Sequence, residues 1–428
     1  MKNYLFACYF LLVIFQFPYF LAAEETAQKK TICLNMIVKN ETKVIRRCLD
    51  SVRPIIDYWV ISDTGSSDGT QDMIKEHMKD IPGELYERPW LNFGHNRNEA
   101  LQLAKGKADY ILFIDADEIL LYDKDFKLPE LDKDFYYIMT HFNGTVYARV
   151  QLINGALNWK WIGVLHEALD APGVLTADTL KGVINEVHTD GARSEDPEKY
   201  KKDVKILEEG LRNEPNNTRY MFYLAQSYKD AGDHENSLKY YKKRIEMGGW
   251  QEEVFWSMFQ VAFMEQLLNM PESQVAESYL KAYYYRPTRI EPLYNLTRYY
   301  RDKQQYNHGY LVGSIAAKIP APPNDLLFVQ KWMYDYHLPL ELSICAYWTG
   351  KYQECADVSA KILEHPNLPA NIRTCVERNM IYANEKIGRY YYRLYEPVPT
   401  LRQIITLSSP RPRLIFPVGM QKIVGQIQ

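Results

Sequence analysis

The chain carries no excess of charge of either sign. Its 428 residues include 51 lysine and arginine side chains against 54 aspartate and glutamate side chains. Nucleic-acid binding usually needs a basic surface, because contacts to the phosphate backbone supply much of the affinity. The composition therefore gives no global electrostatic case for a nucleic-acid partner, and other partners must be argued from local motifs.

Cysteine is scarce, and its spacing suits neither a zinc site nor a set of disulfides. One of the six cysteines, Cys8, lies in an apolar N-terminal stretch. The remaining five are an odd number and contain no CxxC pair. This pattern excludes a zinc ribbon and gives little support to a dense disulfide framework.

An apolar stretch occupies residues 4–23, after Lys2 and before two glutamates. It is typical of a signal peptide or an N-terminal membrane anchor. The small residues Ala22 and Ala23 favour cleavage, whereas a length of about 20 residues also suits a bilayer span. Four N-x-[ST] triplets are compatible with entry into a secretory lumen, although such triplets are common by chance: Asn40, Asn143, Asn216 and Asn295.

Short apolar runs alternate with amphipathic stretches between residues 31 and 118, which is typical of βαβ units. The strands are expected at residues 31–37, 58–62, around Leu85 and 110–114, and the helices at 41–51, 70–79 and 95–105. The run at 110–114 is rich in Ile and Phe without a helical period, so we expect it to be buried on both faces. The pattern predicts a parallel, doubly wound sheet.

The rest of the chain changes character twice. Residues 128–194 contain short β-like runs and several glycines, and we interpret them as the irregular half of the same domain. A helical pattern follows, and the tail has prolines and uncompensated basic residues, typical of a solvated, partly disordered extension. The expected segments are a leader at 1–23, an α/β domain at 31–194, a helical-repeat domain at 196–390 and a tail at 391–428.

The helical region repeats itself. Residues 220–241 place small and large side chains at the spacing of a tetratricopeptide repeat. A shift of 72 positions superposes Leu224 on Leu296, Tyr228 on Tyr300, Asp230 on Asp302 and Ser237 on Gly309. We predict three or four degenerate repeats stacked as helical hairpins; an ordinary helical bundle with an aromatic core is the alternative.

Acidic residues follow two of the expected strands. Asp115, Asp117 and Glu118 come directly after the apolar run at 110–114, and Asp63 ends the strand that begins near residue 58. An Asp-x-Asp alone arises about once by chance in a chain of this length. Because the carboxyl ends of parallel strands share one edge of a sheet, we expect both acidic groups to meet there. Such an edge suits a divalent metal and a phosphorylated ligand.

The loop after Asp63 has its own local chemistry. Gly65 and Gly69 permit a sharp turn, and Asp68 is expected to cap the helix that starts near Thr70. Five short sequence blocks follow one another along the chain: M-I-V-K-N-E (36–41), C-L-D-S-V (48–52), D-T-G-S-S-D-G-T (63–70), W-L-N-F-G-H-N-R-N (90–98) and F-I-D-A-D-E (113–118).

Together these blocks resemble the family 2 glycosyltransferases of the GT-A fold. They are most similar to the branch that fuses this domain to tetratricopeptide repeats. The resemblance implies an α/β fold class, with a GT-A type doubly wound mixed sheet followed by an all-α helical-repeat domain.

The resemblance assigns a nucleotide-sugar pocket to the first blocks. Asp63 would contact the base or ribose of a nucleotide sugar, usually uridine-linked. Lys39, Asn40 and Glu41 follow the first strand beside the same pocket. Arg97 is a candidate diphosphate or base contact, because a guanidinium matches phosphate oxygens in a two-pronged geometry. A surface ion pair is the alternative for Arg97.

The resemblance also implies a metal site. Asp117 would ligate the metal directly, and Asp115 would approach the metal or the ribose, with Glu118 as a structural carboxylate. His188 stands where many GT-A enzymes bring a further metal ligand. A site that joins imidazole to carboxylate suits manganese, so the expected cofactor is Mn²⁺ or Mg²⁺. A satisfied structural histidine is the alternative for His188.

The block W-I-G-V-L-H-E at 161–167 resembles the acceptor side of the family, where a carboxylate removes the acceptor proton. Glu167 is the expected catalytic base, with Asp170 in reserve. His166 is expected either in this block's chemistry or as a structural histidine. These roles imply a metal-dependent, inverting hexosyltransferase that uses a nucleotide-sugar donor.

The sequence leaves alternatives open for the acceptor of the sugar and for the function of the chain. Stacked helices form a concave surface that binds peptides, so a protein or peptide acceptor is attractive; a glycan or a lipid is the alternative. A catalytically silent tetratricopeptide scaffold that binds peptides is the alternative function, against which the intact acidic residues argue. A nucleotidyltransferase would want a glycine-rich basic loop after the first strand, where the sequence offers only Lys39.

An exported enzyme of this kind needs nucleotide sugar on its own side of the membrane. We therefore expect a place in the lumen of the endoplasmic reticulum or Golgi, or membrane anchorage through residues 4–23, with secretion as an alternative. If the leader is instead an anchor that leaves the catalytic domain in the cytosol, the four N-x-[ST] triplets have no role.

Overall fold

A computed structural model describes residues 29–142, 145–173, 175–325 and 327–395 of the chain. The predicted leader at 4–23, the triplet at Asn143 and the tail from residue 396 lie outside these residues. Among the described residues, no helix combines the length and the apolar character needed to cross a membrane.

The N-terminal part is built around a mixed sheet of eight strands, in the order β3-β2-β1-β4-β7-β6-β10-β5. The strands, including a separate β8–β9 hairpin, are β1 (Ile32–Val38), β2 (Tyr58–Asp63), β3 (Gly83–Glu87), β4 (Tyr110–Phe113), β5 (Glu118–Tyr122), β6 (Phe135–Phe142), β7 (Thr145–Asn154), β8 (Lys160–Ile162), β9 (Ala168–Asp170) and β10 (Ala177–Val187). The β3, β2, β1 and β4 strands run parallel, as the alternating pattern predicted. Their carboxyl ends therefore lie at one edge of the sheet.

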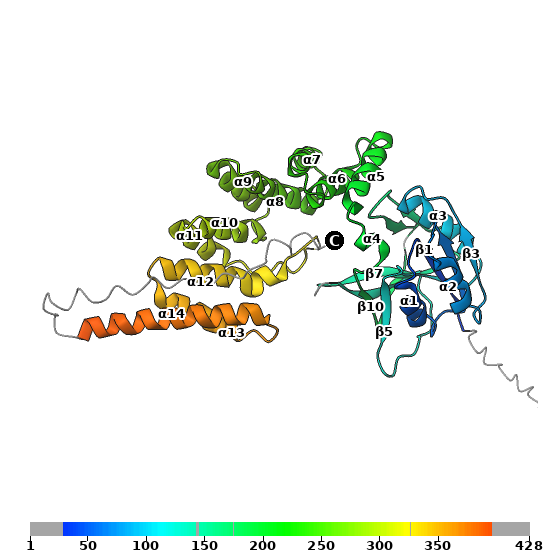
Figure 1. Ribbon diagram of the computed structural model, residues 1–428, viewed down its shortest axis with the longest axis horizontal. Helices are drawn as coiled ribbons and strands as arrows, with labels where there is room; N and C mark the ends of the chain where they lie inside the picture. Colours follow the sequence, from blue (N-terminus) through cyan, green and yellow to red (C-terminus); the bar gives the residue numbers. More distant parts are fainter. Residues whose placement is uncertain (1–28, 143–144, 174, 326, 396–428) are drawn as a thin grey trace, which may run out of the picture.

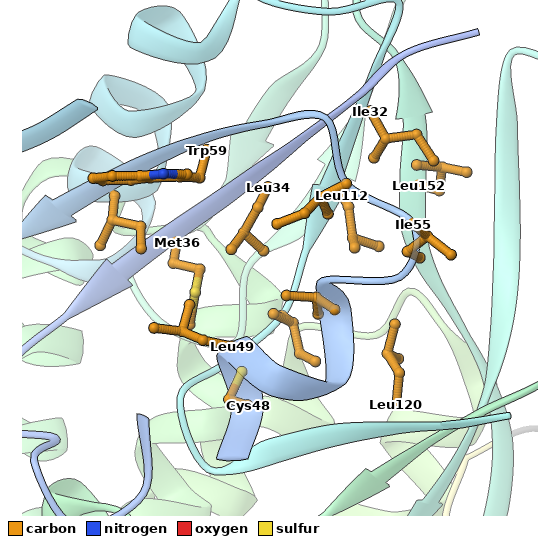
Figure 2. Packing of buried hydrophobic residues seen from close by; sticks show 14 of the residues in the cluster. Ile32, Leu34, Met36, Cys48, Leu49, Ile55, Trp59, Leu112, Leu120 and Leu152 are labelled. Carbon is orange, nitrogen blue, oxygen red and sulfur yellow. The ribbon is translucent and has the colours of Figure 1, made fainter. Parts of the chain in front are cut away.

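Helices cover both faces of the parallel half, namely α1 (Ile45–Val52), α2 (Thr70–His77) and α3 (Phe93–Ala104). The buried side chains of α1 pack on one face of β1, and Figure 2 shows Leu34 and Met36 of β1 beside Leu49 of α1. On the other face, the core contains Cys33 of β1 and Leu101 of α3. The strand β1 is therefore buried on both faces, which explains its continuous apolar run.

The short β-like runs predicted within residues 128–194 form strands of the same sheet, so the segment is more regular than the predicted irregular half. This segment supplies the long strands β6, β7 and β10, which extend the sheet beyond β4. The strand β5, which Glu118 begins, was also missed and pairs antiparallel with β10. The partly buried positions of β6 carry Phe135, Tyr137 and Met139, so this strand lacks the apolar and polar alternation that marks a strand with one exposed face.

A helical-repeat region follows the sheet, as predicted. Its helices are α4 (Ala192–Glu195), α5 (Lys199–Asn213), α6 (Thr218–Asp230), α7 (His234–Glu246), α8 (Gln251–Leu267), α9 (Glu272–Tyr285), α10 (Glu291–Asp302), α11 (Tyr306–Ala316), the π-helical turn η1 (Met333–His337), α12 (Leu338–Trp348), α13 (Tyr352–Leu363) and α14 (Ala370–Tyr395). Consecutive helices from α6 to α13 pack as four antiparallel hairpins within the described residues. In Figure 1 they follow one another in an arc from α5, beside α3, to α14.

The predicted 72-residue shift relates α6 to α10 and α7 to α11. Leu224 and Leu296 occupy equivalent positions on the first helix of each hairpin, and both are buried. Gly309, at the position of Ser237, lets α11 approach both α12 and α10: a Cβ there would lie 2.7 Å from Cys345 Sγ and 3.3 Å from the carbonyl oxygen of Thr297. Small residues at these positions thus permit the close packing that the repeat pattern predicted.

The described cysteines are buried, and none of them forms a disulfide: Cys33, Cys48, Cys345, Cys355 and Cys375. The absence of a disulfide framework among these residues agrees with their spacing in the sequence.

A small apolar cluster joins the sheet domain to the first repeat helices. Its buried members come from the loop after β8 and from α5 and α6: Leu165, Val204, Leu207, Tyr220 and Leu224. Phe93, at the start of α3, packs against the same cluster. The loop between β8 and β9 is therefore held between the two parts of the chain.

Candidate functional site

The carboxyl ends of β1, β2 and β4 bring acidic side chains to one edge of the sheet. Register places Val38 of β1 opposite Asp63 of β2, while Asp115 and Asp117 follow the end of β4. The negative charges of Asp117 and Asp115 are close enough to Glu41, just after β1, to raise its pKa. The edge predicted from the sequence is therefore formed, and it is rich in carboxylates.

Asp63 is fully buried and has one oxygen in use and one without a partner. Its Oδ1 accepts hydrogen bonds from the backbone N–H groups of Gly65 (2.9 Å) and Ser66 (2.8 Å) and from Gln71 Nε2 (3.1 Å). Its Oδ2 is buried and has no hydrogen-bond partner among the described residues. A buried carboxylate oxygen without a donor is costly. The contact of Asp63 with a nucleotide stays a prediction.

The loops after β1 and β2 are tied together by side chains. Asn40 has φ of 58°, and its Oδ1 accepts a hydrogen bond from Ser67 N at 2.8 Å. Asp68 accepts hydrogen bonds from Thr42 and Thr70. Gly69, with φ of 94°, precedes α2, and no side chain caps this helix. Asp68 therefore joins two loops, whereas the sequence predicted only a cap of α2. Burial alone would raise the pKa of Asp68, but the Thr70 and Thr42 hydrogen bonds lower it to about 2.

The other residues predicted after β1 differ in exposure. Lys39 is exposed, and Glu41 is partly buried. Burial, together with the negative charges of Asp117 and Asp115, raises the pKa of Glu41 to about 7. Their predicted contacts to a nucleotide stay predictions.

Two arginines clamp Asp115. Arg97 Nη2 donates to Asp115 Oδ1 at 2.7 Å, and Arg149 Nη2 donates to Asp115 Oδ2 at 3.1 Å. Arg149 also pairs with Glu118, whose Oε2 accepts a hydrogen bond from the Asp115 backbone N–H. Burial would raise the pKa of Asp115, but the two guanidinium groups hold it well below its usual range. Glu118 therefore has the structural role that the sequence predicted.

Arg97 is not the exposed surface ion pair that the alternative reading described. Its side chain is 11 % exposed, lies over the ring of Trp161 at 5.1 Å, and pairs with Asp115 and Glu167. A direct contact from Arg97 to a diphosphate or base stays a prediction. Arg149 was missed by sequence reasoning, although a basic residue inside one of the short β-like runs was a usable signal.

Asp117 and His188 lie next to each other and are candidates for a metal site. The backbone N–H of His188 donates to the Asp117 carbonyl at 3.1 Å, and His188 Nε2 is buried without a hydrogen-bond partner among the described residues. Burial and the charge of Asp115 raise the pKa of Asp117 to about 6, which shows how poorly its negative charge is compensated.

The described residues contain no group of three His, Cys, Asp or Glu side chains arranged to hold a metal ion. Divalent cations in phosphate-handling sites are commonly held by one or two carboxylates, with waters and substrate phosphates completing the shell. Asp117, which forms no ion pair among the described residues, and His188, whose Nε2 has no hydrogen-bond partner there and lies 3.9 Å from Glu186 Oε1, fit such a partial set. Asp115 fits less well, because both of its oxygens already accept hydrogen bonds from arginine.

Glu167 lies at the same edge through its ion pair with Arg97. Its Oε1 accepts the hydrogen bond from Arg97 Nε, and its side chain is 9 % exposed. Asp170, the reserve candidate, is exposed at the far end of β9 opposite Lys160. The structure therefore joins Glu167 to Asp115 through one guanidinium and separates Asp170 from that group.

The repeat region holds the residue before Glu167. The carbonyl oxygen of His166 accepts hydrogen bonds from Arg219 Nε (3.2 Å) and Nη2 (2.9 Å), both from α6. The His166 ring stacks on Tyr223 with centroids 3.9 Å apart, and burial lowers the pKa of His166 to about 3. His166 thus has a structural role, in a left-handed backbone conformation with φ of 52°.

The loop that carries Glu167 also depends on a glycine of α3. A Cβ added at Gly94 would lie 1.9 Å from the carbonyl oxygen of Gly163. We expect Gly94→Ala to lower the free energy of unfolding by about 1–3 kcal/mol, as overpacking does, in urea denaturation followed by circular dichroism.

A matched glycine tests that expectation. Gly388 is also helical, and a Cβ there would meet nothing within 4 Å. Gly388→Ala should therefore raise stability slightly, because alanine is the better helix former. Equal effects of the two substitutions would show that the contact with Gly163 is not what makes Gly94 necessary.

Residues 33–131 match the family described as glycosyl transferase family 2. The chain is similar to the prophage-derived glycosyltransferase SunS of Bacillus subtilis (strain 168), with 27% identity over 241 residues, which cover 52% of this chain and 55% of that protein. It therefore spans about half the length of this relative. A TPR repeat-containing protein of Synechococcus elongatus is 37% identical over 91 residues, 21% of either chain.

Among solved structures, TarS of S. aureus superposes with a TM-score of 0.33 and 13% identity, over 59% of this chain and 54% of that one. The family match contains β1 to β4 and the acidic residues that follow them. Residues 33–131 thus form a family 2 glycosyltransferase domain, which this chain joins to a helical-repeat region.

Proposed function

We propose that the chain is a metal-dependent, inverting glycosyltransferase. It moves a sugar from a nucleotide sugar, with uridine diphosphate as the expected carrier, to a protein, peptide or glycan. The observation that carries this proposal is the buried, unpartnered Oδ2 of Asp63 at the edge where the uncompensated Asp117 also lies. The family match of residues 33–131 supports the same reaction class.

The donor end of the site follows from these groups. Asp63 Oδ2 accepts a hydrogen bond from the base or ribose, which removes its unmet demand for a donor. Asp117 and His188 would hold Mn²⁺ or Mg²⁺. When bound, such a cation would supply positive charge that offsets the negative charge developing on the leaving diphosphate.

The acceptor end is assigned to Glu167. Arg97 donates a hydrogen bond to Glu167 Oε1, and the other carboxylate oxygen of Glu167 has no hydrogen-bond partner among the described residues. That oxygen takes the proton of the acceptor as the acceptor attacks the anomeric carbon. Attack on the face opposite the diphosphate breaks the bond to the leaving group and inverts the configuration. Because Arg97 pairs with both Glu167 and Asp115, it fixes the base relative to the donor end of the site.

A panel of nucleotide sugars tests the proposal. The purified chain is incubated with each sugar nucleotide and manganese, and release of the nucleoside diphosphate is measured. We expect turnover with at least one donor, and loss of that turnover when the metal is chelated. No turnover with any donor, together with tight peptide binding, would instead favour the silent repeat scaffold.

Arg219 provides a separate test of how the base is positioned. Its two hydrogen bonds hold the His166 carbonyl, one residue before Glu167. We expect Arg219→Ala to lower kcat by about 10- to 100-fold with little change in KM for the donor, because a small misplacement of a catalytic group is costly. Steady-state kinetics measures both constants.

Two further variants make this test specific. Arg219→Lys keeps one donor and should restore part of kcat, whereas Arg212→Ala, an exposed residue at the end of α5, should leave kcat unchanged. If Arg219→Ala raises KM and lowers the melting temperature without changing kcat, Arg219 supports only the fold.

The place of the chain in the cell is also proposed. The leader at 4–23 and the need for a nucleotide-sugar supply support the lumen of the endoplasmic reticulum or Golgi, with the leader cleaved or kept as an anchor. Mass spectrometry of the purified protein would reveal both the mature N-terminus and glycans on Asn40, Asn143, Asn216 or Asn295.

A further inference from the structure

Tyr147 of β7 is an aromatic residue that the sheet leaves accessible to a ligand. It is 39 % exposed, so much of its ring surface faces water. Apolar ring surface gains free energy when a ligand covers it. Tyrosine also carries a hydroxyl, so it suits a ligand that presents both apolar and polar groups. The position of this side chain in the sheet indicates which ligand that is.

The strand β7 continues past the end of β4. Leu112 of β4 pairs with Leu152 of β7, and β4 ends one residue later, at Phe113. Because the two strands are antiparallel, residues 145–150 of β7 extend beyond β4, on the side where Asp115 follows it. This part of β7 therefore stands beside the acidic edge of the sheet.

Tyr147 and Arg149 lie on the same face of β7. The register with β6 is continuous over residues 145–150, and residues two apart in a strand point to the same face. Arg149 donates from this face to Asp115 Oδ2 at 3.1 Å. Its partner across the strands, Ile138, belongs to the core that contains the buried side chains of α1. Tyr147 is therefore a neighbour of the arginine that holds Asp115.

The hydroxyl of Tyr147 lies within the electrostatic reach of the acidic edge. Partial burial raises the pKa of Tyr147, the positive charge of Arg149 lowers it, and the negative charges of Glu118 and Asp115 raise it. These interactions mean that the polar end of the side chain lies near the Asp115 clamp, while part of the ring stays exposed.

The order of the strands matches the order of the parts of a nucleotide sugar. Asp63, the proposed contact of the base or ribose, ends β2, and Asp117, the proposed metal ligand at the diphosphate, follows β4. The strands lie in the order β2-β1-β4-β7, with neighbouring strands about 4.8 Å apart. A donor that lies across this edge with its base at β2 and its diphosphate at β4 brings its sugar to β7, where Tyr147 stands.

We propose that the ring of Tyr147 is the surface on which the sugar of the nucleotide-sugar donor packs. One face of a sugar ring presents mainly C–H groups, and these gain dispersion contacts with an aromatic ring. The tyrosine hydroxyl can exchange a hydrogen bond with a sugar hydroxyl. This inference rests on the proposed function and names the residue that contacts the transferred sugar.

This placement leaves the proposed base free for the acceptor. Glu167 reaches Asp115 through Arg97, which donates to Oδ1, whereas Arg149 donates to Oδ2. The base and Tyr147 are thus linked to Asp115 through different arginines and different carboxylate oxygens. A sugar that packs on Tyr147 does not need the side of Asp115 from which Glu167 is held.

Calorimetry on the full chain with Mn²⁺ tests the proposal with defined ligands. These are uridine diphosphate and its conjugates with glucose, galactose and N-acetylglucosamine. We expect Tyr147→Ala to raise Kd for the best-bound sugar nucleotide by about 3- to 10-fold and to leave Kd for uridine diphosphate unchanged. Tyr147→Phe keeps the ring and should retain most of the affinity for the sugar nucleotide.

The neighbouring residue of β7 is the matched control. Val146 is 54 % exposed and, one residue from Tyr147, points to the opposite face of the strand. Val146→Ala should therefore change neither Kd. The melting temperature of each variant is measured alongside, and because Tyr147 is an exposed residue we expect it to stay unchanged.

Three results would overturn the assignment of Tyr147 alone: unchanged sugar-nucleotide affinity in Tyr147→Ala, equal weakening of uridine diphosphate, or a loss in Tyr147→Phe as large as in Tyr147→Ala. Binding of uridine diphosphate by the wild-type chain without binding of any of the three conjugates would also overturn it. No binding of uridine diphosphate by the wild-type chain would contradict the proposed function itself, so the two failures are distinguishable.

Discussion

Asp117→Asn should abolish metal-dependent sugar transfer and leave the fold intact. The substitution keeps the size of the side chain and removes the negative charge that the bound cation needs. Burial and the neighbouring Asp115 raise the pKa of Asp117 to about 6, so in the absence of metal its charge destabilises the folded state. We therefore expect turnover to fall by at least about a hundredfold while the melting temperature is unchanged or higher.

The control is the same substitution at an exposed carboxylate of the same domain. Asp132 is exposed and pairs with Lys133, so Asp132→Asn should keep full turnover. Release of nucleoside diphosphate and the melting temperature are measured for both variants. Undiminished turnover in Asp117→Asn would show that Asp117 is not a metal ligand.

The second large effect is expected at Asp63. Asp63→Asn keeps Oδ1, which accepts the Gly65 and Ser66 N–H groups, and replaces the unpartnered Oδ2 with a donor. A ligand N–H or hydroxyl that donates to Oδ2 would then face another donor. We expect Kd for uridine diphosphate, measured by calorimetry, to rise about 10- to 100-fold. This variant is a more specific test than Asp63→Ala, which would also remove the hydrogen bonds that hold the loop after β2.

Asp109 is a matched control at the opposite edge of the sheet. Its carboxylate accepts the backbone N–H of Thr31 at 2.9 Å, just before β1 and β4 begin. Asp109→Asn should leave nucleotide affinity unchanged. Equal weakening by both variants, or unchanged affinity in Asp63→Asn, would count against a nucleotide contact at Asp63.

The parallel half of the sheet could be predicted because its information is local. The strands β1, β2 and β4 are short apolar runs, and the polar residues that follow Asp63 and Phe113 mark where two of them end. Register then brings Asp63 beside Val38 without any contact distant in sequence being known. The repeat hairpins were predicted for the same reason, since Leu224 and Leu296 recur at a fixed spacing.

The remaining features depend on partners that are far apart in the sequence. Arg149 is one charged residue in β7 until the fold places it beside Asp115. The contact between Arg219 and His166 crosses the junction of the two regions, and the buried Arg289 donates hydrogen bonds to the carbonyl oxygens of Leu327 and Phe328. No periodicity records such contacts, so only the structure shows that Arg97 and Arg149 clamp Asp115 and that α6 holds the residue before Glu167.

A crystal structure of the chain with uridine diphosphate and Mn²⁺ tests the central claim most directly. The account predicts that the base or ribose donates a hydrogen bond to Asp63 Oδ2, and that manganese joins Asp117 to the diphosphate. A nucleotide bound elsewhere, or manganese bound without Asp117, would contradict it.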